Sequence, residues 1–154
     1  LRPTERLDAA LSLAHMRSAF DSYENPTGAA ASNYVGAPLP FVPEFTAGLH
    51  LGYAIPVPNG GEVRLRGDVR YETESYSTIT PTREQTRFPE QTYVDAGVSY
   101  TTPDRRWTLS LSAKNLLDED YELPISGAWA PAQGLYGVGY SAPRTVILRL
   151  RYDL

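Results

Sequence analysis

Residues 145–154 read TVILRLRYDL, and this stretch decides the fold. Every second position is apolar, namely Val146, Leu148, Leu150, Tyr152 and Leu154, while most positions between them are polar or charged. Successive side chains of a β-strand point to opposite faces, so this alternation predicts a strand with one apolar and one charged face. Such a strand separates an apolar environment from a polar one.

Five other segments repeat this alternation, most weakly in the first of them. Their apolar rows cover Leu7–Leu13, Phe45–Ile55, Val63–Tyr71, Val94–Tyr100 and Trp107–Ala113. The chain holds 12 glycines and 13 prolines, and helical periodicity is hard to find. We therefore predict an all-β fold, an antiparallel meander of about six strands.

The connections between these segments alternate in length. Residues 58–61 and 102–105 have tight-turn sequences, whereas the connections near 22–42, 78–90 and 118–139 are long. Short periplasmic turns and long extracellular loops are typical of outer-membrane barrels. This alternation predicts that the chain ends on the periplasmic side.

The two faces predicted for the strands differ in chemistry. Aromatic residues on the apolar parity near the periplasmic strand ends predict a membrane girdle, and these are Tyr53, Tyr100, Trp107 and Tyr152. Phe45, Tyr71 and Tyr140 are candidates for an outer girdle. The opposite parity carries the residues predicted to face a lumen, which are Arg64, Arg66, Asp68, Arg70, Glu72, Lys114, Arg149 and Arg151. We expect these arginines to form salt bridges with lumen and plug carboxylates, with an anion-guiding surface as the alternative.

Such rows of charge suit a wide lumen that holds water or a polar plug, because a small dry barrel would bury them at great cost. Six strands cannot enclose a wide lumen, and they leave two unpaired edges that lipid does not tolerate. We expect further strands, either from an upstream portion or from other copies.

Composition excludes several classes of function. A net charge of −4 with no strongly basic stretch makes nucleic acid an unsuitable partner. The chain has no cysteine, so it can form neither a disulfide nor a thiolate metal site. No apolar run is long enough for a transmembrane helix. The polar start, LRPTER, is no signal peptide, and we expect either earlier processing or a fragment.

Three motifs, in order, resemble those of one protein family. Residues 107–121, WTLSLSAKNLLDEDY, resemble the penultimate strand and following motif of TonB-dependent receptors of the outer membrane. Pro143-Arg144 is similar to the opening of the family's final strand, and Leu39-Pro40 to the entry of an earlier one. The resemblance covers residues 39–154, and 7–23 less fully. The chain departs from the pattern in ending with Leu154, where many outer-membrane proteins have Phe.

This resemblance implies that residues 1–154 are the C-terminal segment of a 22-stranded barrel that an N-terminal plug domain fills. Such receptors lie in the outer membrane of Gram-negative bacteria and actively import scarce nutrients, mostly iron–siderophore complexes. The implied partners are membrane lipid, the remaining barrel and plug, the TonB complex and a small-molecule ligand. Neither a cofactor nor catalysis is implied.

The long connections hold the candidate ligand contacts, which are Arg83, Arg87, Trp129, Tyr136 and Tyr140. We interpret His15 and His50 as ordinary strand residues rather than metal ligands. The acidic run Asp118–Asp120 is interpreted as a solvated turn rather than a calcium site. Two other functions stay open: an outer-membrane barrel enzyme, and a soluble β-domain that binds glycans.

Overall fold

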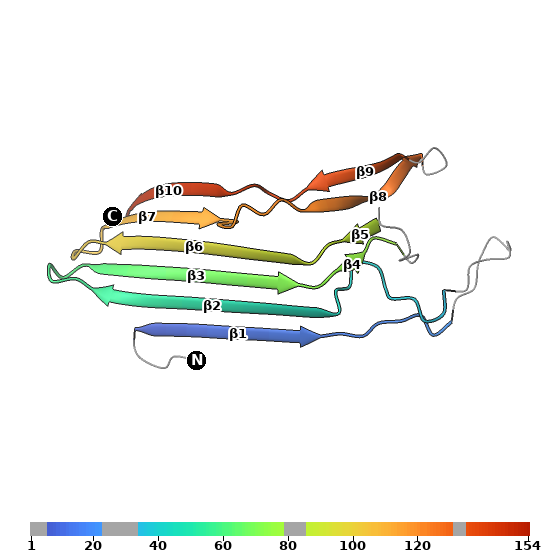
Figure 1. Cartoon of the computed structure of the whole chain (residues 1–154). Helices are drawn as coiled ribbons and strands as arrows, with labels where there is room; N and C mark the ends of the chain where they lie inside the picture. Colours follow the sequence, from blue (N-terminus) through green and yellow to red (C-terminus); the bar gives the residue numbers. More distant parts are fainter. Residues whose placement is uncertain (1–5, 23–33, 79–85, 131–134) are drawn as a thin grey trace.

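The computed structural model describes residues 6–22, 34–78, 86–130 and 135–154, with the backbone alone at 125–130 and 135–136. Six strands form one antiparallel sheet in which chain neighbours lie side by side (Figure 1). They are β1 (Leu7–His15), β2 (Phe45–Pro56), β3 (Glu62–Glu72), β6 (Gln91–Thr101), β7 (Trp107–Lys114) and β10 (Thr145–Tyr152). The predicted six-stranded meander is confirmed, and β1 and β10 are its two edges.

The short and long connections lie at opposite ends of this sheet (Figure 1). The short end carries the β2–β3 and β6–β7 turns. In the first, Gly60 has a left-handed φ of 87°, which is easy for glycine alone. A Cβ on Gly61 would lie 2.7 Å from the Thr101 carbonyl oxygen, so both glycines of this turn are required.

The long connections contain two additional hairpins, and this corrects the prediction that residues 118–139 are a loop. β8 (Glu122–Ala130) pairs with β9 (Leu135–Tyr140), and the short strands β4 (Ser75–Tyr76) and β5 (Arg87–Phe88) pair with each other. Pro124 and the glycines of residues 127–139 hide this hairpin in the sequence, because both residue types are depleted in strands. The register between β8 and β9 also shifts between Ile125 and Ala130.

The register places apolar side chains in rows across the strands. One such row joins Tyr53, Leu65, Val98, Leu111 and Leu148. In the described part of the chain no hydrophobic side chain is buried, and Leu148 is 69% exposed. A single-layer sheet has no core of its own, so something else must cover its apolar face. Among the described residues, no helix is long and apolar enough to cross a membrane.

Candidate functional site: the polar face of the sheet

Three arginines of the polar face are neutralised by a carboxylate two residues away on the same face. Arg64 Nη2 lies 3.1 Å from Glu62 Oε1, and Arg151 Nη2 lies 2.7 Å from Asp153 Oδ1. Arg66 donates from Nε to Asp68 Oδ2 at 2.7 Å. Residues i and i+2 of a strand share a face, so these pairs need no contribution from another strand. Arg149, on the same face of β10, has no ion pair with any described residue within 4.0 Å, and salt bridges with plug carboxylates stay a prediction.

His50, interpreted from the sequence as an ordinary strand residue, joins three strands on this face. Its Nδ1 lies 2.7 Å from Asp68 Oδ1 on β3, and its Nε2 lies 3.1 Å from Asp8 Oδ2 on β1. A Cβ at Gly52 would meet the Asp8 carboxylate, so the glycine leaves room for this carboxylate beside His50. A neutral imidazole can donate from only one nitrogen, so contact with two carboxylates suits the imidazolium.

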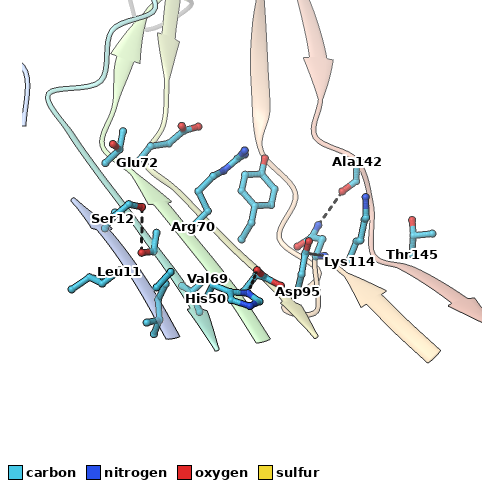
Figure 2. A pocket seen from close by; sticks show the side chains of 18 of the residues that line it. Leu11, Ser12, His50, Val69, Arg70, Glu72, Asp95, Lys114, Ala142 and Thr145 are labelled. Atoms are coloured by element: carbon cyan, nitrogen blue, oxygen red, sulfur yellow. Dashed lines mark hydrogen bonds and ion pairs between the residues drawn. The ribbon is translucent and has the colours of Figure 1, made fainter. Parts of the chain in front are cut away.

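A hollow of about 750 Å³ lies on the polar face, next to the long connections (Figure 2). Arg70 and Lys114 line it from β3 and β7, together with Tyr93 and Asp95 of β6. The Arg70 guanidinium carbon stands 4.9 Å from the centre of the Tyr93 ring, a cation–π contact. Unlike the three paired arginines, Arg70 and Lys114 form no ion pair with any described residue within 4.0 Å.

Asn115 fixes the junction where β7 ends and the β8–β9 hairpin begins. It is 4% exposed and has a left-handed φ of 50°, which asparagine tolerates better than most residues. Its Nδ2 donates to the carbonyls of Glu119 at 2.8 Å and Ala142 at 3.0 Å, and its Oδ1 accepts from Glu119 N at 3.1 Å. One amide therefore ties both sides of the hairpin base to the end of β7.

Two further contacts complete this junction. Asp118 Oδ2 lies 3.0 Å from Arg144 Nη2, so Asp118 is ion-paired within the predicted solvated turn. The Tyr121 hydroxyl accepts from Thr92 N at 2.9 Å and donates to Thr92 O at 3.1 Å, which satisfies β6 backbone beyond its pairing with β7. The Tyr121 ring also meets Tyr93 edge-on, with centroids 5.4 Å apart.

The opposite face carries the aromatic residues predicted for the girdles. Trp107 and Tyr152 are cross-strand partners with ring centroids 4.6 Å apart, and each is nearly half exposed. Tyr53 and Tyr100 lie on the same parity nearer the strand interiors, and the Tyr100 hydroxyl accepts from Asn59 Nδ2 at 2.8 Å. The rings of Phe45 and Tyr71 lie at the other end of the sheet, with centroids 6.3 Å apart. Contact of these side chains with lipid stays a prediction.

The predicted ligand contacts fall partly outside what the structure describes. Arg83 and the side chains of Trp129 and Tyr136 lie outside the described residues. Arg87 Nη1 lies 3.3 Å from Glu74 Oε2, so its charge is partly neutralised, whereas Tyr140 is 63% exposed. Their contact with a ligand stays a prediction.

Sequence reasoning missed the roles of Asn115, Tyr121 and Ser141. The resemblance identified Asn115 and Tyr121 as part of a motif, but it did not predict their hydrogen-bond partners. Ser141 Oγ accepts from Tyr121 N at 3.0 Å, a contact between residues 20 apart that no local pattern reveals. His15 Nε2 lies 3.8 Å from Glu44 Oε1. Within the described residues, no cluster of three or more metal-ligating side chains is found.

The chain is similar to one protein family in sequence and to solved structures in fold. A family described as TonB dependent receptor-like, beta-barrel, matches residues 6–116. No curated protein matches the sequence. The ferric preacinetobactin receptor BauA from Acinetobacter baumannii shares the fold over 99% of this chain, with a TM-score of 0.78 and 20% identity. The ferric yersiniabactin uptake receptor FyuA from Yersinia pestis does so over 99%, with a TM-score of 0.78 and 18% identity. The chain spans 20% and 22% of these two proteins.

Proposed function

The chain belongs to the TonB-dependent receptor β-barrel family, and on this premise we propose that its sheet is part of a barrel wall in the outer membrane of a Gram-negative bacterium. The observation that carries this proposal is a single-layer sheet with one apolar face, one charged face and two free edges. Lipid would cover the apolar face, and additional strands would pair with β1 and β10, because an unpaired edge is costly in a bilayer. Residues 1–154 would then be the C-terminal segment of a barrel whose polar face surrounds a plug domain.

The orientation follows from the connections. The β2–β3 and β6–β7 turns would face the periplasm, and the hairpins β4–β5 and β8–β9 would face the outside. Long connections on a rigid scaffold are where binding residues concentrate. The outer hairpins are therefore proposed to capture the ligand.

The proposed activity is active uptake of an iron–siderophore complex, with energy supplied by the TonB complex through parts of the receptor outside this chain. Two structural neighbours are described as receptors for ferric preacinetobactin and ferric yersiniabactin, and these ferric ligands support an iron complex as the cargo. The exposed apolar face supports contact with lipid, and the charged face supports contact with a polar plug.

The test is uptake of radioactive iron by cells that express the whole receptor containing this chain. We expect accumulation from at least one complex in a panel of ferric siderophores, and loss of it when either the receptor or TonB is deleted. Accumulation that is unchanged in the deletion strains would contradict the proposal.

The orientation can be tested separately, because this chain has no cysteine to interfere with labelling. Cysteines introduced at Asp120 and Asn59, which are both exposed, mark the long and short ends of the sheet. We expect a membrane-impermeant maleimide to label the Asp120→Cys receptor on intact cells and to leave Asn59→Cys unlabelled until the outer membrane is opened. The reverse pattern would show that the topology is inverted.

A further inference from the structure

We propose that Phe41 is a releasable clasp that couples the connection before β2 to the β4–β5 hairpin. Phe41 belongs to residues 39–44, LPFVPE, a motif that has no part in the proposed uptake. Figure 1 shows this segment passing β4 on its way into β2. At the point of contact, the Phe41 N–H donates to the Tyr76 carbonyl at 2.8 Å. Two long connections that are separate in the sequence therefore meet at one residue.

The backbone of Phe41 is strained. Its φ is 62°, in the left-handed region that favours glycine. The other described non-glycine residues with positive φ are Arg105, Asn115 and Asp118, and two of these are of the types that tolerate it. Phe41 follows Pro40 in a turn, where glycine or asparagine is usual when φ is positive. A bulky residue persists in this conformation only when its surroundings hold it, and such outliers concentrate at clamps and switches.

Two contacts hold Phe41 in place, and both come from the hairpin. One is the hydrogen bond to Tyr76 of β4. The other is the ring of Phe88 on β5, which lies 5.7 Å from the Phe41 ring between centroids, at an interplanar angle of 55°. Tilted ring pairs at this distance stabilise by more than the area that they bury. Phe41 is nevertheless 55% exposed, so its ring can leave Phe88 without the rearrangement of a core.

The hairpin gains from the same contacts. β4 and β5 have two residues each, and a hairpin of two short strands has little stability by itself. The Ser77 N–H adds one backbone hydrogen bond beyond these pairs, to the Thr86 carbonyl at 2.7 Å. The hydrogen bond and the ring of Phe41 are therefore a large share of what can hold the hairpin in one position.

The segment that carries Phe41 is anchored to the main sheet at its other end. The Glu44 carbonyl accepts from Met16 N at 2.8 Å, just after β1. Phe45 N donates to Thr73 Oγ1 at 3.0 Å, just after β3. When the Phe41 ring is seated on Phe88, the segment and the hairpin are one unit, and when it leaves, the strained backbone relaxes and the two separate. A shift in either connection is transmitted to the other through this element with two arrangements.

The experiment measures protection against hydrogen exchange by mass spectrometry on the whole receptor in detergent, in peptides that cover either Phe41 or Ser77. Phe88→Ala should lower protection around Phe41 roughly three- to tenfold, and Phe41→Ala should do the same around Ser77, because each removes one ring of the pair. Phe41→Gly should lower protection around position 41 less than Phe41→Ala does, because glycine keeps the left-handed turn without strain.

Leu39→Ala is the matched control. It removes an apolar side chain from the same segment, 40% exposed, and should change protection in either region by less than about twofold. The double variant Phe41→Ala/Phe88→Ala tests whether the two rings act through one shared contact, in which case its loss of protection equals that of a single variant.

Any of four results would overturn the clasp: unchanged protection around Phe41 in Phe88→Ala, unchanged protection around Ser77 in Phe41→Ala, an equal effect of Leu39→Ala, or a double variant that shows the product of the two single losses. Heat-modifiable migration on gels confirms that each variant is folded. If Phe88→Ala does not fold, Phe88→Leu removes the ring while it keeps an apolar side chain, and the same result is expected. These outcomes do not depend on the ligand, so they are independent of the iron-uptake test.

Discussion

At the scale of single residues, the Asn115 side chain connects the end of β7 to the base of the β8–β9 hairpin. Its three side-chain hydrogen bonds join Glu119 and Ala142 at the base of the β8–β9 hairpin. Because the site is buried, removing the amide leaves the Ala142 carbonyl and the Glu119 N–H without this partner, and each such group costs about 1–3 kcal/mol, whereas the Glu119 carbonyl keeps only a contact with Ser141 Oγ at 3.4 Å. This residue is therefore a better target for mutation than any exposed charge on the polar face.

We predict that Asn115→Ala lowers the free energy of unfolding of the intact barrel by roughly 3 kcal/mol or more, from the lost hydrogen bonds and from alanine at a positive φ. Asn115→Gly should recover only the part due to φ. Asn59→Ala is the control, since Asn59 is exposed and its loss should cost about 1 kcal/mol. The measurement is equilibrium unfolding in liposomes, and equal costs for Asn115 and Asn59 would contradict the role given to the junction.

A second prediction at this scale concerns the two faces of β10. Leu148→Arg should cost roughly 2–4 kcal/mol if the residue lies near the bilayer midplane, because it puts a charge into lipid. Ile147→Arg, one position away on the polar face, should cost much less. The same unfolding titration compares the two variants, and indistinguishable costs would show that the apolar row does not face lipid.

At the scale of elements, the β6–β7 turn is a small unit whose stability depends on pH. Thr102 Oγ1 donates to Asp104 Oδ1 at 2.5 Å, and Arg106 N donates to the same oxygen at 3.1 Å. These two hydrogen bonds, the hydroxyl contact above all, lower the pKa of Asp104 below its usual value. A lowered pKa means that the folded turn binds the proton less readily than the unfolded chain does. The stabilisation is therefore complete above the ordinary carboxyl pKa of about 3.9 and is lost as the pH falls through the lower folded value.

We accordingly expect the wild-type receptor to be more stable than Asp104→Asn at pH 7, and this difference to shrink as the pH approaches 3. The measurement is the difference in free energy of unfolding at the two pH values. Asp153→Asn serves as a control for a carboxylate whose partner is an arginine two residues away. A difference that is constant with pH would show that the ionised Asp104 does not stabilise the turn.

The β8–β9 hairpin is the element proposed to capture ligand, and the Asn115 junction should allow its tip to be removed cleanly. Deletion of residues 125–136 leaves Asn115, Tyr121, Ser141 and Ala142 in place, so the barrel should still assemble and reach the surface. We expect binding of the ferric siderophore by whole cells to fall at least about tenfold, as loss of a major contact would cause. Surface labelling controls for export, and unchanged affinity at normal surface display would remove this hairpin from the binding site.

At the scale of the whole molecule, we predict that the sheet requires strands from outside this chain. β1 and β10 are free edges, and no described hydrophobic side chain is buried. We predict that residues 1–154 expressed alone form no closed monomeric barrel, because six strands leave unpaired backbone groups at both edges. The checks are size-exclusion chromatography in detergent, heat-modifiable migration and protease resistance. A protease-resistant, heat-modifiable monomer would contradict this.

Much of the fold follows from the sequence alone, because its cause is local. A strand turns each successive side chain to the opposite face, so the parity of Val146 to Leu154 already separates the two environments. Turn chemistry is equally local, which is why the short connections at 58–61 and 102–105 could be placed. The six strands, their order and the two ends of the sheet were predictable for this reason.

Tertiary structure decided what depends on register between distant strands. His50 lies between Asp8 and Asp68, which are 42 and 18 residues away, and Asn115 reaches Ala142 across 27 residues. Side-chain packing across the sheet decides which partner an arginine contacts. Arg66 pairs with the carboxylate of Asp68, two residues along its own strand, whereas Arg70 lies over the Tyr93 ring on the next strand. A period-2 pattern fixes the face of a residue but not its neighbour on that face, so only the assembled sheet could bring Arg70, Tyr93 and Lys114 to one hollow.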